Sequence, residues 1–505
     1  MNSLRSTIFF LACIVFSLTS FAEKSFVATK PSGQYQTYTL STSPLDAAYN
    51  TTQISAGISW LGLGGGTVSF TSGTFFVRQP NPSESAEGQA NAAITITSTV
   101  HLVGLGSSLT YLVADNRATT IFLFEGGNAT TSSIRSMTIQ GNPYRKINGD
   151  YILDRSPLVI PHQGSSLESL VIVDGGGNGP LTYFSAGPDV VFLNPANVGI
   201  FLENAAMVQI TSCVFNFFST VYPYNAQTGG NNVGIFGLNA NNGVNVWNCS
   251  FSGSSYLDSS APGYNPNPQP PPPGGITKES YAADGLVWLQ VGGDFDINGN
   301  TITDYRLEAT HIQAGPAYIQ NNTFSTRDKG VSSTACSVES NIPNMSADYY
   351  FESNTVNGGG SAVNYPSENL YREDLRYSIT IQANTISLAR PTVQISQWTV
   401  PAINLAGCQQ ATIQNNTFTS VGLAVQFGNS CGTASINGND MRGVKSGCVV
   451  DSEGPAPVLP TLSGIDISNN LMAKGISFDI QLLRSLFREQ RHLYFNSVGH
   501  GKYIL

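Results

Sequence analysis

The sequence predicts an all-β protein that folds as a right-handed, single-stranded parallel β-helix, a solenoid closed by a C-terminal capping helix. Three observations indicate this fold: an Asn-containing motif recurs at regular spacing, charged residues are scarce, and Gly is frequent. Charged residues make up 11% of the chain and Gly occurs 51 times. This composition is poor for surface helices but suits short strands joined by tight turns.

The repeat reads Ile-x-x-Asn, followed by Thr or another small residue and then an apolar residue. Its Asn residues are 22, 32, 30, 32, 23 and 31 positions apart. The shortest steps match one coil of three strands and three turns, and the longer steps add a loop. We expect these Asn side chains to stack as a hydrogen-bonded ladder and to tolerate a left-handed backbone. The ladder residues are Asn300, Asn322, Asn354, Asn384, Asn416, Asn439 and Asn470.

The residues upstream and the two ends fit the same solenoid. Cys213 and Cys249 fall in the Asn column, and we expect neighbouring buried thiols there rather than a disulfide. A coil cannot bury its apolar face alone, so the solenoid needs a cap at each end. A helix from Leu45 to Leu61 is expected at the front. Apolar residues at helical spacing between Phe478 and Phe487 predict the second cap.

These features divide the chain into four parts. Residues 1–22 have the basic start, short apolar run and small residues of a signal peptide, so we expect a secreted, extracellular protein without a membrane span. Residues 23–66 form the N-terminal segment and cap, 67–475 the β-helix, and 476–505 the capping helix and tail. Loop insertions are expected at about 142–163 and 252–283. We expect the protein to be a monomer.

The charge balance restricts the partners. The net charge is −9 and the isoelectric point is about 5.0. Binding to nucleic acid needs clustered Lys and Arg and is therefore disfavoured. Few charges together with many Asn and Tyr residues favour a neutral or weakly acidic polysaccharide as the partner.

Several segments resemble a known superfamily. Residues 64–77, which read GGGTVSFTSGTFFV, resemble the opening coil of the pectate-lyase-like superfamily. Residues 101–106 and 134–142 resemble its following strand, glycine turn and next coil. The resemblance covers nearly the whole mature chain and implies a parallel β-helix that acts on polysaccharides. It implies no catalytic residue, because the coils lack the family motifs of polygalacturonase-like hydrolases and pectate lyases, and a Gly-His-Gly at 499–501 lies in the tail.

Charged side chains concentrate in one coil, from Asp284 to His311, of an otherwise charge-poor solenoid. Two registers are open, and in both Asp284 and the 306–308 segment lie on adjacent coils of one face. Carboxylates one coil apart would be roughly 5 Å from each other, as in retaining glycosidases, and two coils would give roughly 9–10 Å, as in inverting ones. The catalytic candidates are Asp284, Glu308, Arg306 and His311, and the substrate-binding candidates are Trp288, Tyr305 and Asp304.

These residues favour a polysaccharide-active enzyme of the glycoside hydrolase type, which needs no metal or other cofactor. A Ca²⁺-assisted lyase that acts on uronates is the alternative chemistry. There Asp284, Asp304 and Glu308 would hold Ca²⁺, and Arg306, His311 or Tyr305 would act as the base. A non-catalytic β-helix that binds glycans for adhesion is the alternative from another class.

Overall fold

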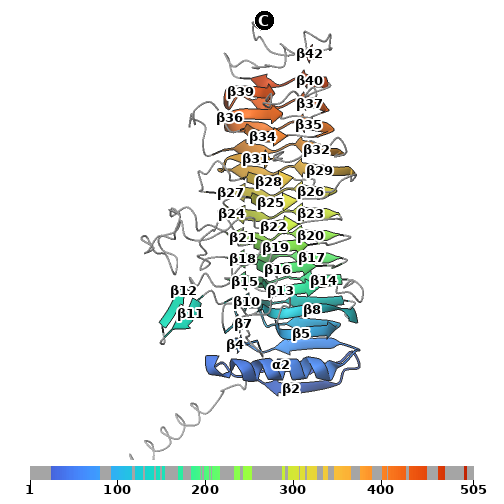
Figure 1. Ribbon diagram of the computed structural model, residues 1–505, viewed down its shortest axis with the longest axis vertical. Helices are drawn as coiled ribbons and strands as arrows, with labels where there is room; N and C mark the ends of the chain where they lie inside the picture. The colour runs from blue at the N-terminus through green and yellow to red at the C-terminus, as the bar shows by residue number, and fades with distance from the viewer. Residues whose placement is uncertain are drawn as a thin grey trace, which may run out of the picture.

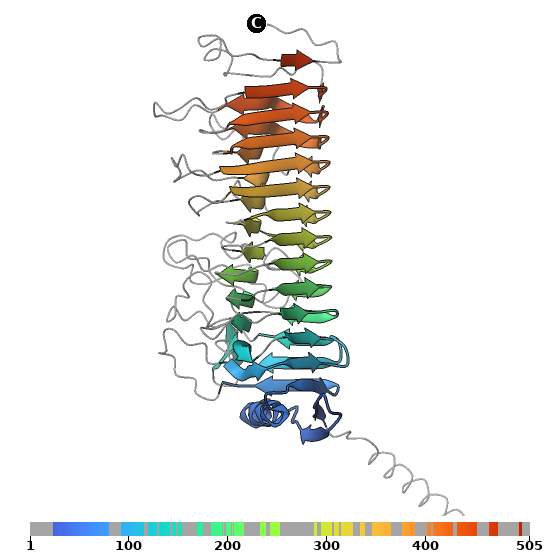
Figure 2. The ribbon, with the colours of Figure 1, turned by 90° about the vertical axis from the view of Figure 1, so that its right-hand side faces the viewer.

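The protein is a long solenoid of stacked β-strand coils, seen in two orientations in the computed structural model (Figures 1 and 2). Strands of successive coils pair in parallel and form three ladders, here called sheets A, B and C. The predicted parallel β-helix is therefore confirmed. The structure describes residues 24–79, 92–115, 120–128, 131–141, 144–147, 150–153, 169–174, 183–193, 195, 198–203, 205, 207–216, 233–238, 243–252, 287–289, 294–305, 308–312, 315–326, 334–338, 346–364, 376–388, 401–405, 408–427, 432–451, 464–472 and 494–496.

Sheet A contains 16 strands and runs the length of the solenoid. All its neighbours are parallel except at the first end, where β1 pairs antiparallel with both β2 and β3. Its strands, in spatial order, are β2 (Tyr35–Thr39), β1 (Ser25–Thr29), β3 (Gly66–Phe70), β6 (Val100–Val103), β9 (Thr131–Arg135), β14 (Tyr183–Ala186), β17 (Val208–Thr211), β20 (Val244–Trp247), β23 (Phe295–Asn298), β26 (Ala317–Gln320), β29 (Ser346–Glu352), β32 (Arg376–Gln382), β35 (Gln410–Gln414), β37 (Thr433–Asn437), β40 (Gly464–Ser468) and β42 (Tyr494–Asn496).

Sheets B and C are joined through one long strand, β36 (Thr417–Phe427), which takes part in both. The other strands of sheet B are β4 (Gly73–Val77), β7 (Thr110–Ala114), β10 (Met137–Gln140), β15 (Val190–Leu193), β18 (Cys213–Asn216), β21 (Ser250–Ser252), β24 (Thr301–Thr303), β27 (Thr323–Ser325), β30 (Thr355–Asn357), β33 (Thr385–Ser387), β38 (Asp440–Met441) and β41 (Leu471–Met472). Those of sheet C are β5 (Ala92–Ser98), β8 (Thr120–Asn128), β13 (Ser169–Asp174), β16 (Val198–Glu203), β19 (Val233–Leu238), β22 (Val287–Leu289), β25 (Glu308–Ile312), β28 (Thr334–Val338), β31 (Ser361–Asn364), β34 (Pro401–Leu405) and β39 (Val444–Asp451).

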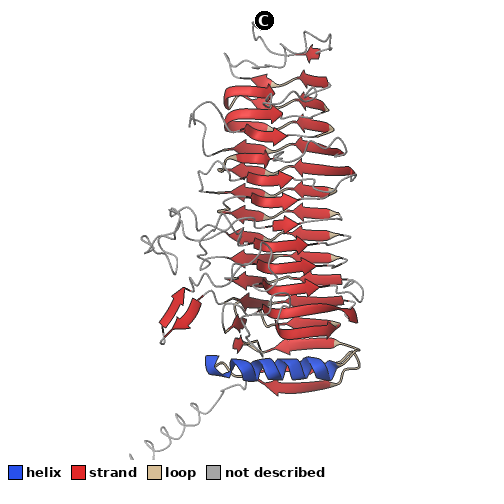
Figure 3. Cartoon of the chain, viewed as in Figure 1, coloured by secondary structure: helices blue, strands red, loops and turns tan. Residues whose placement is uncertain are grey.

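A helix covers the first coil, as Figure 3 shows. The 3₁₀ turn η1 (Pro44–Asp46) leads into α2 (Ala47–Leu61), which buries Ile54, Ile58 and Leu61. Gly57 faces β1 because a Cβ there would lie 2.4 Å from the ring of Phe26. Within the first expected insertion, β11 (Tyr144–Ile147) and β12 (Asp150–Leu153) form an antiparallel hairpin.

The Asn ladder forms as predicted and runs from Asn300 to Asn470. Each Asn accepts the backbone N–H of the ladder residue in the preceding coil and donates to a carbonyl oxygen in sheet A. For Asn354, the bond accepted from Asn322 N and the bond donated to Ile319 O both measure 2.8 Å. The sequence led us to expect a left-handed backbone at the ladder Asn itself. In the structure, the left-handed residue is the one before it. Ser353, Ala383 and Asn415 there have φ values of 56°, 56° and 55°.

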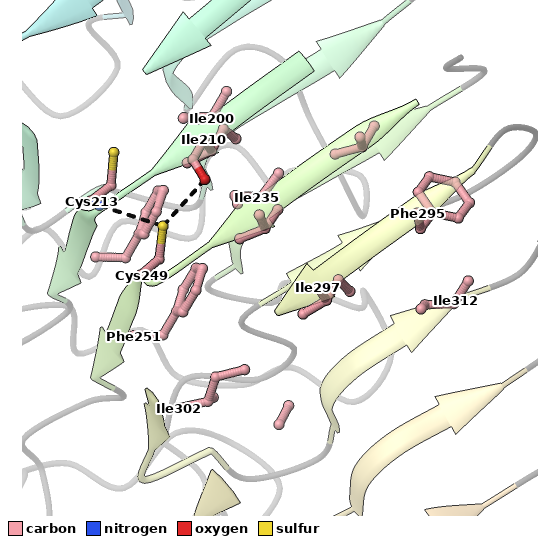
Figure 4. Packing of buried hydrophobic residues seen from close by; sticks show 14 of the residues in the cluster. Ile200, Ile210, Cys213, Ile235, Cys249, Phe251, Phe295, Ile297, Ile302 and Ile312 are labelled. Atoms are coloured by element: carbon pink, nitrogen blue, oxygen red, sulfur yellow. Dashed lines mark hydrogen bonds between the residues drawn. The ribbon is translucent and has the colours of Figure 1, made fainter. Parts of the chain in front are cut away.

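The interior of the solenoid consists of stacked apolar columns (Figure 4). Phe215 and Phe251 lie on neighbouring strands of sheet B, with ring centroids 4.7 Å apart and an interplanar angle of 3°. Cys213 and Cys249 start the Asn column as free, buried thiols, and Cys213 N donates to Cys249 Sγ at 3.4 Å. Their predicted placement is confirmed.

The C-terminal end is only partly described. The helix predicted between Phe478 and Phe487 lies outside the described residues. Beyond it, β42 pairs in parallel with β40 and adds one more strand to sheet A.

Candidate functional site

The outer face of sheet C carries the chemically richest side chains of the solenoid. Alternation along each strand sends successive side chains to opposite faces. In β13, Val171 and Val173 belong to the interior core, whereas Ile172 belongs to a separate cluster on the outside. This outer face changes character from coil to coil, and three groups of residues lie on it.

The first group is an apolar patch that consists of Ile172, Val198, Phe201, Val233 and Phe236. The rings of Phe201 and Phe236 stack with centroids 5.7 Å apart. All five side chains are at most 2% exposed, although they point away from the interior of the coil. The apolar patch is therefore shielded from water.

The second group is an acidic ladder beside the apolar patch, made of Glu125, Asp174 and Glu203. Asp174 pairs in register with Glu125 on one side and with Glu203 on the other, so the three carboxylates occupy successive coils. In-register side chains on adjacent strands are roughly 5 Å apart. Glu125 is exposed, and Asp174 and Glu203 are partly exposed. Burial, and secondly the charge of Asp174, raise the pKa of Glu203. This ladder therefore places a carboxyl with a raised pKa next to a second carboxyl.

The third group is a polar patch several coils further on, made of Glu308, His311, Thr334, Ser337, Ser361 and Asn364. Its strand positions continue those of the apolar patch: β25, β28 and β31 follow β22 and β19 in register. His311 Nδ1 is hydrogen-bonded to Glu308 Oε2, and the histidine is 5% exposed. Thr334 Oγ1 and Ser361 Oγ lie 2.9 Å apart. The patch therefore holds an acid–imidazole pair in a largely buried polar setting.

The structure brings together some of the site residues expected from the sequence. Glu308 and His311 are in contact, and the backbone of Trp288 pairs with that of His311 on the adjacent coil. Asp284 and Arg306 lie outside the described residues, so the expected pairing of Asp284 with Glu308 stays a prediction.

Tyr305 does not fit the substrate-binding role expected of it, whereas for Asp304 that role stays a prediction. Tyr305 is 0% exposed and belongs to the interior core, so the expectation that its ring stacks on a sugar was wrong. Asp304 occupies the turn after β24 with φ of 55°, and its N–H donates to Ser325 O at 2.8 Å. This turn sends the next side chain, Tyr305, inward.

The acidic ladder was not predicted from the sequence, where all candidate site residues lay between Asp284 and His311. A signal for it exists, because strands β8, β13 and β16 each carry an acid directly after a run of apolar residues: IFLFE, LVIVD and GIFLE. Aligning these strand ends instead of the Asn column would have stacked the three acids.

The described residues hold no group of three or more His, Cys, Asp or Glu side chains that could bind a metal ion. Within the same residues, no helix is long and apolar enough to cross a membrane.

Comparisons with known proteins give structural neighbours only. No protein-family model matches the chain, and no curated relative matches it. PfbA, a surface adhesin of Streptococcus pneumoniae, is 11% identical, with a TM-score of 0.44 over 88% of this chain and 93% of that one. The A-module of the mannuronan C-5 epimerase AlgE6 from Azotobacter vinelandii is 11% identical, with a TM-score of 0.37 over 89% and 95%.

A third neighbour is the catalytic unit of a GH87 α-1,3-glucanase from Streptomyces thermodiastaticus, 11% identical, with a TM-score of 0.34 over 85% of this chain and 66% of that one. These neighbours are an adhesin, an epimerase module and a glucanase, so they share no single activity. The strand pairing shows that the chain is a parallel β-helix protein.

Proposed function

We propose that this protein is a secreted, polysaccharide-active enzyme, a glycoside hydrolase that works on the outer face of sheet C with Asp174 and Glu203 as its reacting carboxyls. One observation carries the proposal. These two acids lie in register on neighbouring strands, and the pKa of one of them, Glu203, is raised by burial and by its neighbour's charge. Glycosidic bond cleavage uses two carboxyls, and a raised pKa favours one of them as the acid.

In this proposal, Glu203 donates its proton to the oxygen of the glycosidic bond as that bond breaks. Asp174 attacks the anomeric carbon and forms a glycosyl ester. Water then attacks the ester and gives its proton to Glu203, which restores both carboxyls. Because carboxyls on neighbouring strands are roughly 5 Å apart, the expected outcome is retention of the anomeric configuration.

The test is a set of single variants assayed for release of reducing ends from a panel of neutral and uronate polysaccharides. Asp174→Asn and Glu203→Gln should each lower turnover by about a hundredfold or more. Asp466→Asn, an exposed acid on sheet A far along the solenoid, is the matched control and should leave turnover unchanged. If both variants keep wild-type turnover, the assignment of Asp174 and Glu203 fails.

The acid–imidazole pair, Glu308 with His311, supports a second candidate chemistry. Together with Asp284 and Arg306 it was the site expected from the sequence, and it stays a proposal for hydrolysis or for a Ca²⁺-assisted lyase reaction on uronates. Glu308→Gln belongs in the same assay. A lyase makes an unsaturated sugar, so absorbance of the product that disappears with EDTA and with Glu308→Gln would favour this second site.

A non-catalytic glycan-binding protein is the remaining alternative. Binding of a polysaccharide without release of reducing ends or unsaturated products, in the wild type, would support it and would contradict the hydrolase. Secretion is tested separately: N-terminal sequencing of protein recovered outside the cell should begin at Glu23, and retention of residues 1–22 would contradict the signal peptide.

A further inference from the structure

Sheet A also carries an unusual feature on its outer face, away from the site on sheet C. One column of outward side chains runs through β20, β23, β26, β29, β32, β35 and β37, which lie side by side in Figure 1. The column is polar except for two tyrosines in its middle. It reads Asn245, Asp296, Tyr318, Tyr350, Thr380, Thr412 and Ser435.

The two tyrosine rings form a stacked pair that is open to solvent. The ring centroids of Tyr318 and Tyr350 are 4.9 Å apart, and the interplanar angle is 3°. Tyr318 is 38% exposed. The stacked phenylalanines Phe215 and Phe251 lie inside the solenoid, where they contribute to the core. The tyrosine pair contributes little to the core and keeps aromatic surface available to a ligand.

The pair is bounded by short side chains. Asp296 precedes Tyr318 and Thr380 follows Tyr350 in the same column, so no third aromatic ring continues the stack at either end. A flat ligand ring bound over Asp296 would stack on Tyr318 and continue the aromatic stack. The carboxylate of Asp296 would then be within reach of the hydroxyl groups of the ligand. The apolar face of a pyranose ring has the shape and chemistry for this place.

The next outward column provides hydrogen-bonding groups along the same path. Gln320 Nε2 donates to Glu352 Oε2 at 2.9 Å, and Gln414 Nε2 donates to Gln382 Oε1 at 2.5 Å. These groups lie on successive coils, roughly 5 Å apart, and follow the solenoid axis. Amides and carboxylates beside aromatic rings are suited to a chain of sugar hydroxyls.

The charge around the tyrosines selects among sugars. Burial, and next the charge of Asp348, raise the pKa of Tyr350, and the charge of Glu352 raises that pKa further. With Asp296 on the other side, the described charges beside the pair are carboxylates. A uronate chain would be repelled there, whereas a neutral chain would not.

From the geometry we infer that the outer face of sheet A is a second glycan-binding surface, centred on Tyr318 and Tyr350, which takes a neutral sugar polymer along the solenoid axis. This surface would hold polysaccharide whether or not sheet C cleaves it. The inference therefore goes beyond the proposed hydrolase and does not depend on it.

The test is isothermal titration with neutral hexasaccharides (β-1,4-glucan, β-1,3-glucan, α-1,4-glucan and β-1,4-mannan) and with a galacturonate hexamer as the acidic probe. Each is titrated into the full chain and into its Asp174→Asn variant, which isolates binding from turnover on sheet C. At least one neutral hexamer should bind. Tyr318→Ala should weaken that binding about tenfold, and Tyr318→Phe, which keeps the ring, should change it by less than about twofold.

Three results would overturn the inference: no neutral hexamer binds, Tyr318→Ala binds like the wild type, or the galacturonate hexamer binds as well as the neutral ones and depends equally on Tyr318. An unchanged unfolding midpoint in Tyr318→Ala is the folding control. Light scattering of the wild type and of Tyr318→Ala tests whether a second copy of the chain occupies this face instead of a glycan. A wild-type dimer that Tyr318→Ala dissociates would show that it does and would also overturn the inference.

Discussion

The Asn ladder gives the most exacting prediction about stability, and Asn416 is the best place to test it. This side chain is 0% exposed. It accepts from Asn384 N at 3.0 Å and from Asn384 Nδ2 at 2.9 Å. It donates to Ile381 O and to Asn439 Oδ1, both at 2.9 Å. Asn416→Ala removes all four hydrogen bonds and leaves a backbone N–H and a carbonyl unsatisfied in the interior.

The cost follows from the number of bonds. At about 1 kcal/mol net for each hydrogen bond, Asn416→Ala should lower the free energy of unfolding by about 4 kcal/mol. The neighbour Asn415 is the matched control, because it is exposed and the equivalent turn position in the preceding coil is already Ala383. Asn415→Ala moves an alanine into a left-handed turn and should cost no more than about 1 kcal/mol.

Hydrogen exchange at the Asn384 amide, followed by mass spectrometry, measures the effect at the ladder itself. A local loss of about 4 kcal/mol speeds exchange about a thousandfold, whereas the control should speed it by less than about tenfold. Equal exchange rates and equal urea midpoints for the two variants would refute the account of the ladder as a main source of stability.

Three further predictions follow from the same structure. Glu203→Gln should raise the unfolding midpoint at pH 7 and leave it unchanged at pH 3. The pKa of Glu203 is raised in the folded protein, so its contribution to stability is present at low pH and is lost as the pH rises through that pKa. A larger gain at pH 3 than at pH 7 would contradict this. Burial raises the pKa of Cys336 to about 12, so a thiol reagent at pH 8 should label it only after unfolding, and labelling of the folded protein would contradict its burial. Gly65→Ala should lower the unfolding midpoint by several degrees, since φ is 66° and the new Cβ would lie 1.9 Å from Thr99 O; wild-type stability would contradict that contact.

The solenoid could be predicted because parallel stacking turns a sequence repeat into a spatial column. Asn300 and Asn322 are 22 residues apart and Asn322 and Asn354 are 32 apart, yet all three fall in one ladder. The extra residues are accommodated in the loops that lead from sheet B to sheet C and from sheet C to sheet A, whereas the Asn turn between sheets A and B keeps its length. The repeat can therefore be recognised in the sequence around the Asn turn, because the length of that turn is the same in every coil of the ladder.

The site was harder to predict for the same reason. Sheet C borders the variable loops, so the Asn column does not fix which of its residues are neighbours. Aligning Asp284 with the 306–308 segment left two registers open, whereas the pairing of Trp288 with His311 fixes an offset of 23 positions in the strands themselves. The burial of Tyr305 depends on the left-handed turn at Asp304, which alternation along a strand cannot anticipate.

In the proposed reaction, two carboxyls on neighbouring strands of sheet C hydrolyse a glycosidic bond through a covalent intermediate. Proton NMR of the first product released from a cleaved oligosaccharide tests it most directly. The spacing of Asp174 and Glu203 predicts that the new reducing end first appears in the anomeric configuration of the substrate and only later mutarotates. A first product with the opposite configuration, or one with a double bond in the sugar ring, would contradict the account.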